Sequence, residues 1–210
     1  MEELIKKLII DGVLKTPRLI GAFYRIGRQD FLLAEYRDQA AADHPLPTSH
    51  GQTISQPWTV AFMLELLQPG QGEKILDVGS GSGWQTALLA ELVGPDGKVT
   101  AIERIPDLSR FGQANAGKYN FNNIEFICGD GTRGYKRSAP YDKIIVAAAA
   151  EIGIPDILLQ QLKVGGRLVI PVGKYEQEMV MVDKISDNDF REKKFPGFQF
   201  VPLVPSKWGE

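Results

Sequence analysis

The strongest constraint on the fold is a glycine-rich turn between a short apolar run and a segment with helical spacing. Ile75 to Val78 predicts a buried strand, and residues 84–92 have the apolar periodicity of a helix. Glycines between them let the backbone turn sharply and let a ligand approach where a Cβ would collide. The helix would present unpaired N–H groups and its positive dipole end to that ligand. The pattern predicts a nucleotide-type cofactor site at the carboxyl end of a parallel strand, with a purely structural turn as the alternative. The binding residues expected here are Asp77, Gly79, Ser80, Gly81 and Gly83.

The spacing of the glycines bears on which cofactor the turn binds. A dinucleotide fingerprint, G-x-G-x-x-G, would require a third glycine at position 84, where this chain has Trp84. Asp77 also places a carboxylate where two phosphates would lie, and like charges repel. A cationic or zwitterionic ligand fits better, and S-adenosylmethionine, with its ammonium and sulfonium groups, is the candidate.

Two further acidic residues follow predicted strands. Glu103 ends the strand 98–103, where a carboxylate can accept hydrogen bonds from both ribose hydroxyls. Asp130 follows the strand 124–128 and could accept from an adenine amino group, with Gly131 beside it. Each acid alone could be a solvated loop residue or a helix cap. Three strand ends in order, each closing on an acid or a glycine loop, favour one binding site.

The order of predicted elements indicates the fold class. Strands are expected at 74–78, 98–103, 124–128, 142–147, 167–172 and 178–182, with a last strand at 198–203 and helices from 57 to 67 and from 155 to 165. Strands alternating with helices predict an α/β, doubly wound, Rossmann-like sheet that is mostly parallel, and short late turns predict antiparallel edge strands. Residues 1–56 predict an N-terminal helical cap before the core at 57–210, and we expect one domain.

Composition excludes several function classes. A net charge of −2 gives no reason to expect nucleic acid or an anionic membrane as partner. No apolar run approaches the roughly 20 residues of a membrane span, and the N-terminus lacks a signal-peptide pattern, so we expect a cytoplasmic protein. The single cysteine, Cys128, lies in a predicted buried strand and is expected to be inert packing. Two histidines are too few for a metal site of usual form, and none is expected.

Several motifs together resemble one family. Asp77 to Gly83 looks like motif I of the class I methyltransferases, which many methyltransferases share. The more specific segment Gly51-Gln52-Thr53-Ile54-Ser55-Gln56-Pro57 is similar to the signature of the protein-L-isoaspartate O-methyltransferases. Further stretches that match in order are 102–106, 129–131, 139–142, 161–173 and 200–203.

The resemblance implies methyl transfer from S-adenosylmethionine to the free carboxylate of isoaspartyl residues in damaged peptides and proteins. It implies that Ser55 is catalytic and meets the substrate carboxylate, while Gln52, Thr53 and Ile54 line the cofactor and substrate cleft. Glu103 would hold the ribose with Arg104 beside it, and Asp130 with Gly131 the adenine. Val201, Pro202 and Leu203 would offer backbone groups to the peptide. The family is usually monomeric.

Alternatives remain open at this point. Ser55 stands just before Pro57 and could serve as a helix N-cap, alone or in addition. The chain also departs from the usual family pattern at Thr48, Ser49, Ala147 and Gln199, which bears on substrate recognition. The competing functions are a methyltransferase for RNA or a small molecule and a cofactor-binding protein without activity. A nicotinamide oxidoreductase is disfavoured by Trp84.

Overall fold

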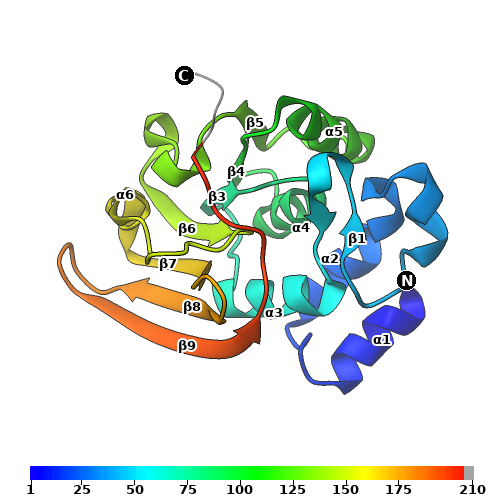
Figure 1. The fold of residues 1–210 in the computed structure, drawn as a ribbon, viewed down its shortest axis with the longest axis horizontal. Coiled ribbons are helices and arrows are strands. Elements are labelled where there is room, and N and C mark those ends of the chain that lie inside the picture. The colour runs from blue at the N-terminus through cyan, green and yellow to red at the C-terminus, as the bar shows by residue number, and fades with distance from the viewer. Residues whose placement is uncertain (206–210) are drawn as a thin grey trace.

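A mostly parallel sheet forms the centre of the computed structural model, which describes residues 1–205 (Figure 1). Within these residues the sheet has seven strands in the order β5-β4-β3-β6-β7-β8-β9. Its strands are β3 (Lys74–Val78), β4 (Lys98–Glu103), β5 (Ile124–Cys128), β6 (Tyr141–Val146), β7 (Leu162–Val172), β8 (Gln177–Lys184) and β9 (Phe190–Phe198). The first five are parallel, and β8 and β9 pair antiparallel. The doubly wound α/β fold with an antiparallel edge is confirmed.

Successive strand residues face opposite sides of the sheet and enter two apolar clusters. Ile75, Val99 and Ile145 belong to the cluster that contains α3 (Pro57–Leu67) and α4 (Trp84–Val93). Leu76, Ile102 and Ile144 belong to the other cluster, which α6 (Asp156–Gln161) enters through Leu158. The remaining helix beside the parallel strands, α5 (Pro106–Ala116), contacts β4 and β5. Helices therefore cover both faces, as a parallel sheet buried on both sides requires.

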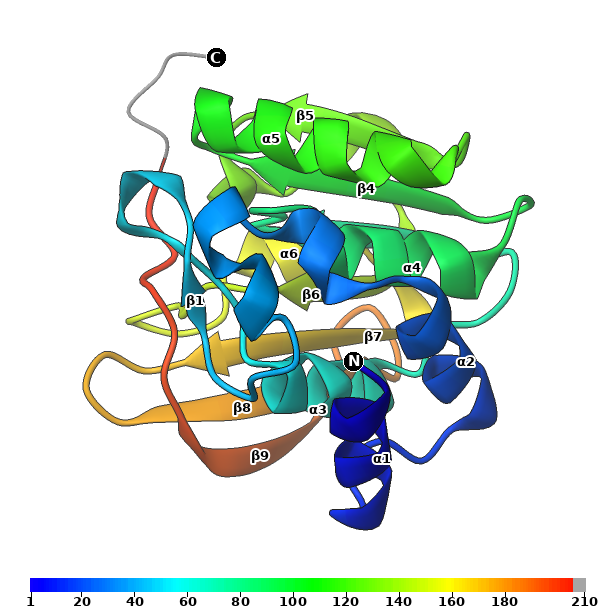
Figure 2. The same cartoon turned by 90° about the vertical axis from the view of Figure 1, so that its right-hand side faces the viewer.

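The N-terminal region packs as short helices on the first cluster. It comprises α1 (Glu2–Ile10), α2 (Pro17–Arg25) and the 3₁₀ turns Arg28–Phe31 and Ala34–Gln39. Leu8, Leu19 and Phe23 are buried in the same cluster as α4. In Figure 2, α1 and α2 lie below α4 on the side that faces the viewer. No helix within residues 1–205 is both long enough and apolar enough to cross a bilayer.

Two segments far apart in sequence meet at the carboxyl ends of the parallel strands. One is the hairpin of β1 (Leu46–Pro47) and β2 (Thr53–Ile54), and the other is the segment that follows β9. Both lie at the left of Figure 2, where the arrowhead of β7 also points. Pro202 of that segment forms a parallel bridge with Ala149. These segments border the edge of the sheet where α/β proteins bind ligands.

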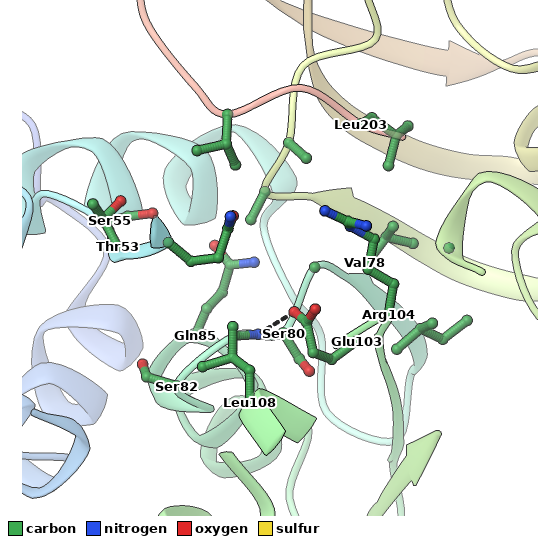
Figure 3. A pocket seen from close by; sticks show the side chains of 18 of the residues that line it. Thr53, Ser55, Val78, Ser80, Ser82, Gln85, Glu103, Arg104, Leu108 and Leu203 are labelled. Atoms are coloured by element: carbon green, nitrogen blue, oxygen red, sulfur yellow. Dashed lines mark hydrogen bonds between the residues drawn. The ribbon is translucent and has the colours of Figure 1, made fainter. Parts of the chain in front are cut away.

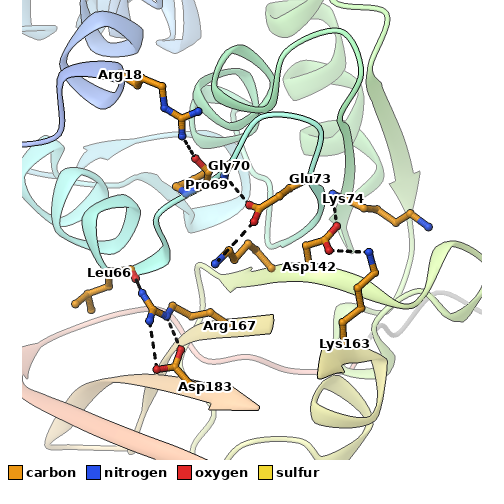
Figure 4. Close-up of polar contacts among 11 residues, drawn as sticks. Arg18, Leu66, Pro69, Gly70, Glu73, Lys74, Asp142, Lys163, Arg167 and Asp183 are labelled. Atoms are coloured by element: carbon orange, nitrogen blue, oxygen red, sulfur yellow. Dashed lines mark hydrogen bonds and ion pairs between the residues drawn. The ribbon is translucent and has the colours of Figure 1, made fainter. Parts of the chain in front are cut away.

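Polar contacts connect the strands at the opposite end of the sheet, remote from the glycine turn (Figure 4). Arg167 donates to both carboxylate oxygens of Asp183, at 2.6 and 3.2 Å, and to the Leu66 carbonyl at 2.7 Å. Asp142 accepts from Lys163 Nζ at 2.6 Å and from the Lys74 N–H at 2.8 Å. These bonds tie β3, β6, β7 and β8 together at the end remote from the glycine turn.

The expected last strand at 198–203 is wrong. β9 ends at Phe198, and Phe200 instead exchanges two hydrogen bonds with the Gln177 side chain, at 2.6 and 3.1 Å. The register between β8 and β9 shifts at Gln177, and Gly197 has φ +92°. The chain therefore leaves the ladder and crosses the carboxyl ends of the parallel strands.

The helix expected to reach residue 165 ends four residues earlier, and the expected burial of Cys128 is also wrong. β7 begins at Leu162 and passes through an irregularity before Arg167 pairs with Lys143. A Cβ on Gly166 would lie 2.8 Å from the Asp142 carbonyl oxygen, so the glycine permits close packing of β7 on β6. Cys128 is exposed because β5 is an edge strand and Cys128 is its last residue.

Candidate functional site

The glycine turn after β3 adopts backbone angles that favour glycine. Gly79, Gly81 and Gly83 have φ of +80°, +52° and +86°. A Cβ on Gly83 would lie 2.6 Å from the carbonyl oxygen of Gly112 in α5, closer than such atoms approach. The N–H groups of Gly79 and Ser80 donate to the Ile102 carbonyl at 2.8 and 3.0 Å. The turn is thus fixed against β4 and α5 with an open path to its backbone.

Glu103 connects this turn to the end of β4 (Figure 3). One carboxylate oxygen accepts from the Gly81 N–H at 3.1 Å, and the other accepts from the Ile105 N–H at 3.0 Å. The side chain is buried, with 6% exposure, yet it lines the cavity above the turn. Each oxygen accepts one bond from the protein, which leaves acceptor capacity toward that cavity.

Asp77 lies beneath the turn and faces α4. Its carboxylate accepts hydrogen bonds from Gln85 Nε2 at 2.8 Å and from the Thr86 hydroxyl at 2.6 Å. Complete burial raises the pKa of Asp77 to about 6, although the bonds from Thr86 and Gln85 lower it; the charge of Glu103 adds a smaller upward shift. Asp77 therefore fixes α4 against the turn from below and is not on the wall of the cavity.

One cavity brings together most of the residues predicted from the sequence. The residues on its wall are Gln52, Thr53, Ile54, Ser55, Gly79, Ser80, Gly81, Glu103, Arg104, Gly131, Val201, Pro202 and Leu203. Asp77, Gly83 and Asp130 do not line it. The Asp130 carboxylate instead accepts from the N–H and the hydroxyl of Thr132, at 3.0 and 2.7 Å, and caps the short 3₁₀ turn Gly131–Arg133.

Ser55 reaches the cavity from the end of the β1–β2 hairpin. The N-cap alternative for Ser55 is wrong, because Gln56 is the N-cap residue of α3 and the Asp43 carboxylate accepts from the Trp58 N–H at 2.9 Å. The side chain of Ser55 is thus not used to cap α3. Ser55 is part of the wall and lies beside Thr53 in Figure 3.

A buried arginine, which the sequence did not reveal, supports the hairpin from behind. Arg28 is fully buried and donates to the carbonyls of Ala42 and His44 at 2.8 Å and of Ser55 at 3.1 Å. Its guanidinium also lies 5.6 Å from the ring centroid of Trp84, the first residue of α4. An isolated arginine in a polar N-terminal segment carries no pattern that would distinguish it from a surface residue.

A second contact holds the tip of the hairpin. His50 Nε2 lies 3.1 Å from Asp107 Oδ2, in the first turn of α5. His50 has φ +58°, a left-handed conformation that is uncommon for a non-glycine residue. This contact joins the residue just before the signature segment to the helix that follows Glu103.

The wall also contains residues that the sequence did not single out as site residues. They are Val60, Val78, Ser82, Trp84, Gln85, Ile102, Leu108, Ala147, Ala148 and Val204. Most are apolar and belong to the helices or strand ends already predicted. Their position next to the glycine turn and to Glu103 could have identified Val78, Ser82 and Ile102.

Comparison with known proteins agrees with this geometry. The family model for protein-L-isoaspartate(D-aspartate) O-methyltransferase matches residues 1–207. The protein-L-isoaspartate O-methyltransferase of Methanopyrus kandleri is 44% identical over 97% of this chain and 90% of its own. The enzyme of Methanothrix thermoacetophila is 46% identical over 92% of this chain and 90% of its own.

A solved structure gives the same result for the fold. A crystal structure from Plasmodium falciparum, described as a putative protein-L-isoaspartate O-methyltransferase in complex with S-adenosyl-L-homocysteine, superposes with a TM-score of 0.85 at 24% identity. It covers 96% of this chain and 97% of its own. With the matched family model and relatives, the fold and the glycine-turn cavity define a Rossmann-like methyltransferase. The chain belongs to the protein-L-isoaspartate(D-aspartate) O-methyltransferase family, and the resemblance noted in the sequence is confirmed.

Proposed function

We propose that this protein transfers a methyl group from S-adenosylmethionine to the free carboxylate of L-isoaspartyl residues in damaged peptides and proteins. The observation that carries the proposal is that Ser55, the signature serine, and the glycine turn with Glu103 line the same cavity. A methyl donor at the turn and an acceptor at Ser55 would share this space.

The residues at the turn fit S-adenosylmethionine. Ser80 Oγ is buried and has no hydrogen-bond partner within residues 1–205, and Ser80 lines the cavity. Unpaired buried hydroxyls are uncommon, so a ligand group is a natural partner. Glu103 would accept from the ribose hydroxyls with Arg104 beside it, while Gln52, Thr53 and Ile54 enclose the ligand. Gly131 would border the adenine. Asp130 does not line the cavity, so it would influence adenine binding only indirectly, through the neighbouring Gly131.

The acceptor needs orientation and no general base. A carboxylate has a reference pKa near 4, so at neutral pH it is already ionised and nucleophilic. The bound S-adenosylmethionine supplies the electrophilic methyl group. The Ser55 hydroxyl would donate to one carboxylate oxygen and leave the other free to react. Orientation and proximity of this kind can lower a barrier by up to about 7–11 kcal/mol.

The segment after β9 has few backbone groups left for the substrate. The Val201 carbonyl accepts from Ala149 at 2.8 Å, and the Leu203 N–H donates to Ala149 at 2.7 Å. The N–H of Val201 and the carbonyls of Pro202 and Leu203 make no such bonds within the described chain. We infer that these three groups are the ones that contact the peptide.

The test is transfer of labelled methyl to paired peptides, one with L-isoaspartate and one with normal aspartate. Base-labile label in the isoaspartyl peptide alone would support the proposal. Cofactor binding by calorimetry without transfer to either peptide would overturn it and favour another acceptor.

The cellular setting stays a prediction from the sequence. We expect a monomer, because the family that the chain resembles is usually monomeric, and light scattering would test this. With a net charge of −2 we expect no nucleic-acid partner, and we expect no membrane partner and a cytoplasmic location.

A further inference from the structure

A second groove adjoins the cavity on the side away from the glycine turn. The two share the wall residues Thr53, Ser55, Ala147 and Val201, so the groove opens directly from the Ser55 position. Its far wall is formed by residues from the start of α3 and from the end of β9. In Figure 1 the end of β9 lies beside α3.

Aromatic side chains dominate the far wall of the groove. Trp58, Phe198 and Phe200 line it and are each half-buried. Trp58 stacks on Phe62 with ring centroids 5.2 Å apart and planes at 10°, and Phe198 packs against both rings at 6.2 and 5.2 Å. These contacts fix the rings without burying them fully, so they form a rigid apolar surface.

The groove has no charged side chain among the residues that line it. Gln199, an exposed polar residue of its wall, stands where an arginine is common in the family. A charged ligand group placed here would lose water without gaining an opposite charge. The chemistry of the wall therefore suits an apolar or aromatic group.

The occupant follows from the continuity of the two spaces. An isoaspartyl substrate is part of a polypeptide, so the chain must leave the Ser55 position in some direction, and the groove starts there. The backbone of residues 200–203 cannot hold this flank as a full strand. The Gln177 side chain is hydrogen-bonded to the N–H and the carbonyl of Phe200. The backbone of Ala149 is hydrogen-bonded to the Val201 carbonyl and the Leu203 N–H, and Pro202 has no N–H. Side-chain contacts must therefore supply part of the binding.

We propose that this groove is a side-chain subsite that selects isoaspartyl peptides with an aromatic or large apolar residue near the isoaspartate. The proposal rests on the proposed function and specifies its substrate class. The aromatic residue packs on Trp58 and Phe198, and acidic or basic residues in the same place are disfavoured.

The test compares peptides that are identical except at one position, two residues before or two residues after the isoaspartate. Phe, Gly, Lys and Glu are placed there in turn. One aromatic contact corresponds to a factor of about 3 to 10 in kcat/KM. The wild-type enzyme should therefore prefer Phe to Gly by about that factor on one side, with Lys and Glu below Gly.

Variants locate the preference. Trp58→Ala should lower the ratio of kcat/KM for the Phe peptide to kcat/KM for the Gly peptide to about 1. Phe121→Ala is the matched control, since Phe121 lies in the stacked pair with Tyr119 (6.1 Å, 18°) and not in the groove. It should keep the Phe preference.

A surface change tests the same site without touching the aromatic stack. Gln199 is exposed, so Gln199→Glu should leave the fold intact. It should raise kcat/KM for the Lys peptide and lower it for the Glu peptide, each by about two- to fivefold. Equal kcat/KM for all isoaspartyl peptides, or a Phe preference that survives in Trp58→Ala, would overturn the subsite while leaving the methyltransferase activity in place. Failure to methylate any isoaspartyl peptide would remove the proposed function and the subsite with it.

Discussion

The guanidinium of Arg28 and the main-chain carbonyl of Ser55 are joined by a hydrogen bond of 3.1 Å. Arg28 is fully buried and makes no ion pair with a carboxylate in the described part of the chain. Burial lowers its pKa to about 10, with a partly opposing effect of Asp43, so Arg28 is charged at neutral pH. Burial of such a charge costs free energy. We interpret the buried guanidinium as the group that holds Ser55 in position relative to Trp84 and the glycine turn.

Replacing Arg28 by Met should impair catalysis beyond its effect on stability. The Ala42, His44 and Ser55 carbonyls would lose their donor, and each unpaired buried group costs about 1–3 kcal/mol. A shift of Ser55 by about 1 Å should lower kcat about 100-fold. The measurement is kcat and KM at a temperature where the variant is folded by circular dichroism.

Arg167→Met is the matched control for Arg28→Met. Arg167 also donates a hydrogen bond to a carbonyl, that of Leu66, but at the end of the sheet remote from the glycine turn. It should destabilise the fold and leave kcat unchanged. An equal loss of kcat in the two variants would show that Arg28 has only a structural role.

Replacing Ser55 by Ala should lower kcat/KM about 10- to 100-fold, since a hydrogen bond to a charged group contributes about 1.5–3 kcal/mol. The affinity for S-adenosylmethionine and the thermal midpoint should stay unchanged. Full activity of the variant would exclude positioning of the carboxylate by this hydroxyl.

Asp77→Asn should make the protein more stable above pH 7. The folded-state pKa of about 6 exceeds the ordinary 3.8, so the folded state holds the proton more tightly. The stability that Asp77 contributes is present below pH 3.8 and is lost as the pH rises through 6. The difference corresponds to at most about 3 kcal/mol. Urea unfolding should give the variant a higher free energy of unfolding than the wild type at pH 8 but not at pH 4. An equal difference at both pH values would contradict this.

Gly83→Ala should destabilise the protein and weaken cofactor binding. An alanine at this position would cost about 1–2 kcal/mol because φ is +86°. Its Cβ would also lie 2.6 Å from the Gly112 carbonyl oxygen and overlap it. Gly72→Ala is the control, with φ +74° and no atom within 4 Å of the added Cβ. We expect a loss of about 3 kcal/mol or more at Gly83 and about 1 kcal/mol at Gly72, measured by thermal unfolding. Equal losses would mean that the close approach of α5 is unimportant.

Glu103→Gln should weaken S-adenosylmethionine binding about 10- to 100-fold. The added amide N–H₂ would face either the Gly81 or the Ile105 N–H, which now donate to the carboxylate. Calorimetry would measure the change, with Glu91→Gln as control because Glu91 pairs with Arg25 on the surface of α2 and α4. Unchanged affinity in Glu103→Gln would remove Glu103 from the cofactor site.

The parts of the fold that the sequence predicted are those governed by local pattern. The apolar runs at β3 and β4 and the helix α3 after Gln56 agree with their predicted limits, because periodicity and Pro57 determine them. The predicted position of the last strand was wrong because the Gln177 side chain, 23 residues away in sequence, is hydrogen-bonded to Phe200. Only the sheet order reveals that Cys128 lies on an edge strand.

The candidate site shows the same division. The glycine turn, Glu103 and the signature segment could be predicted because each stands at a strand end or in a motif. Arg28, the His50–Asp107 contact and the aromatic groove depend on long-range packing, which the order of residues does not reveal. The division of the chain into a cap at 1–56 and a core stays a prediction.

The most direct test of the proposed function follows an isoaspartyl peptide and its aspartyl counterpart in one reaction, separated by chromatography and identified by mass. With S-adenosylmethionine present, the isoaspartyl peptide alone should be consumed, first to a methyl ester and then to a succinimide that hydrolyses partly to the aspartyl form. Consumption of both peptides at equal rates, or of neither while the cofactor binds, would contradict the assignment of the isoaspartyl carboxylate as the acceptor.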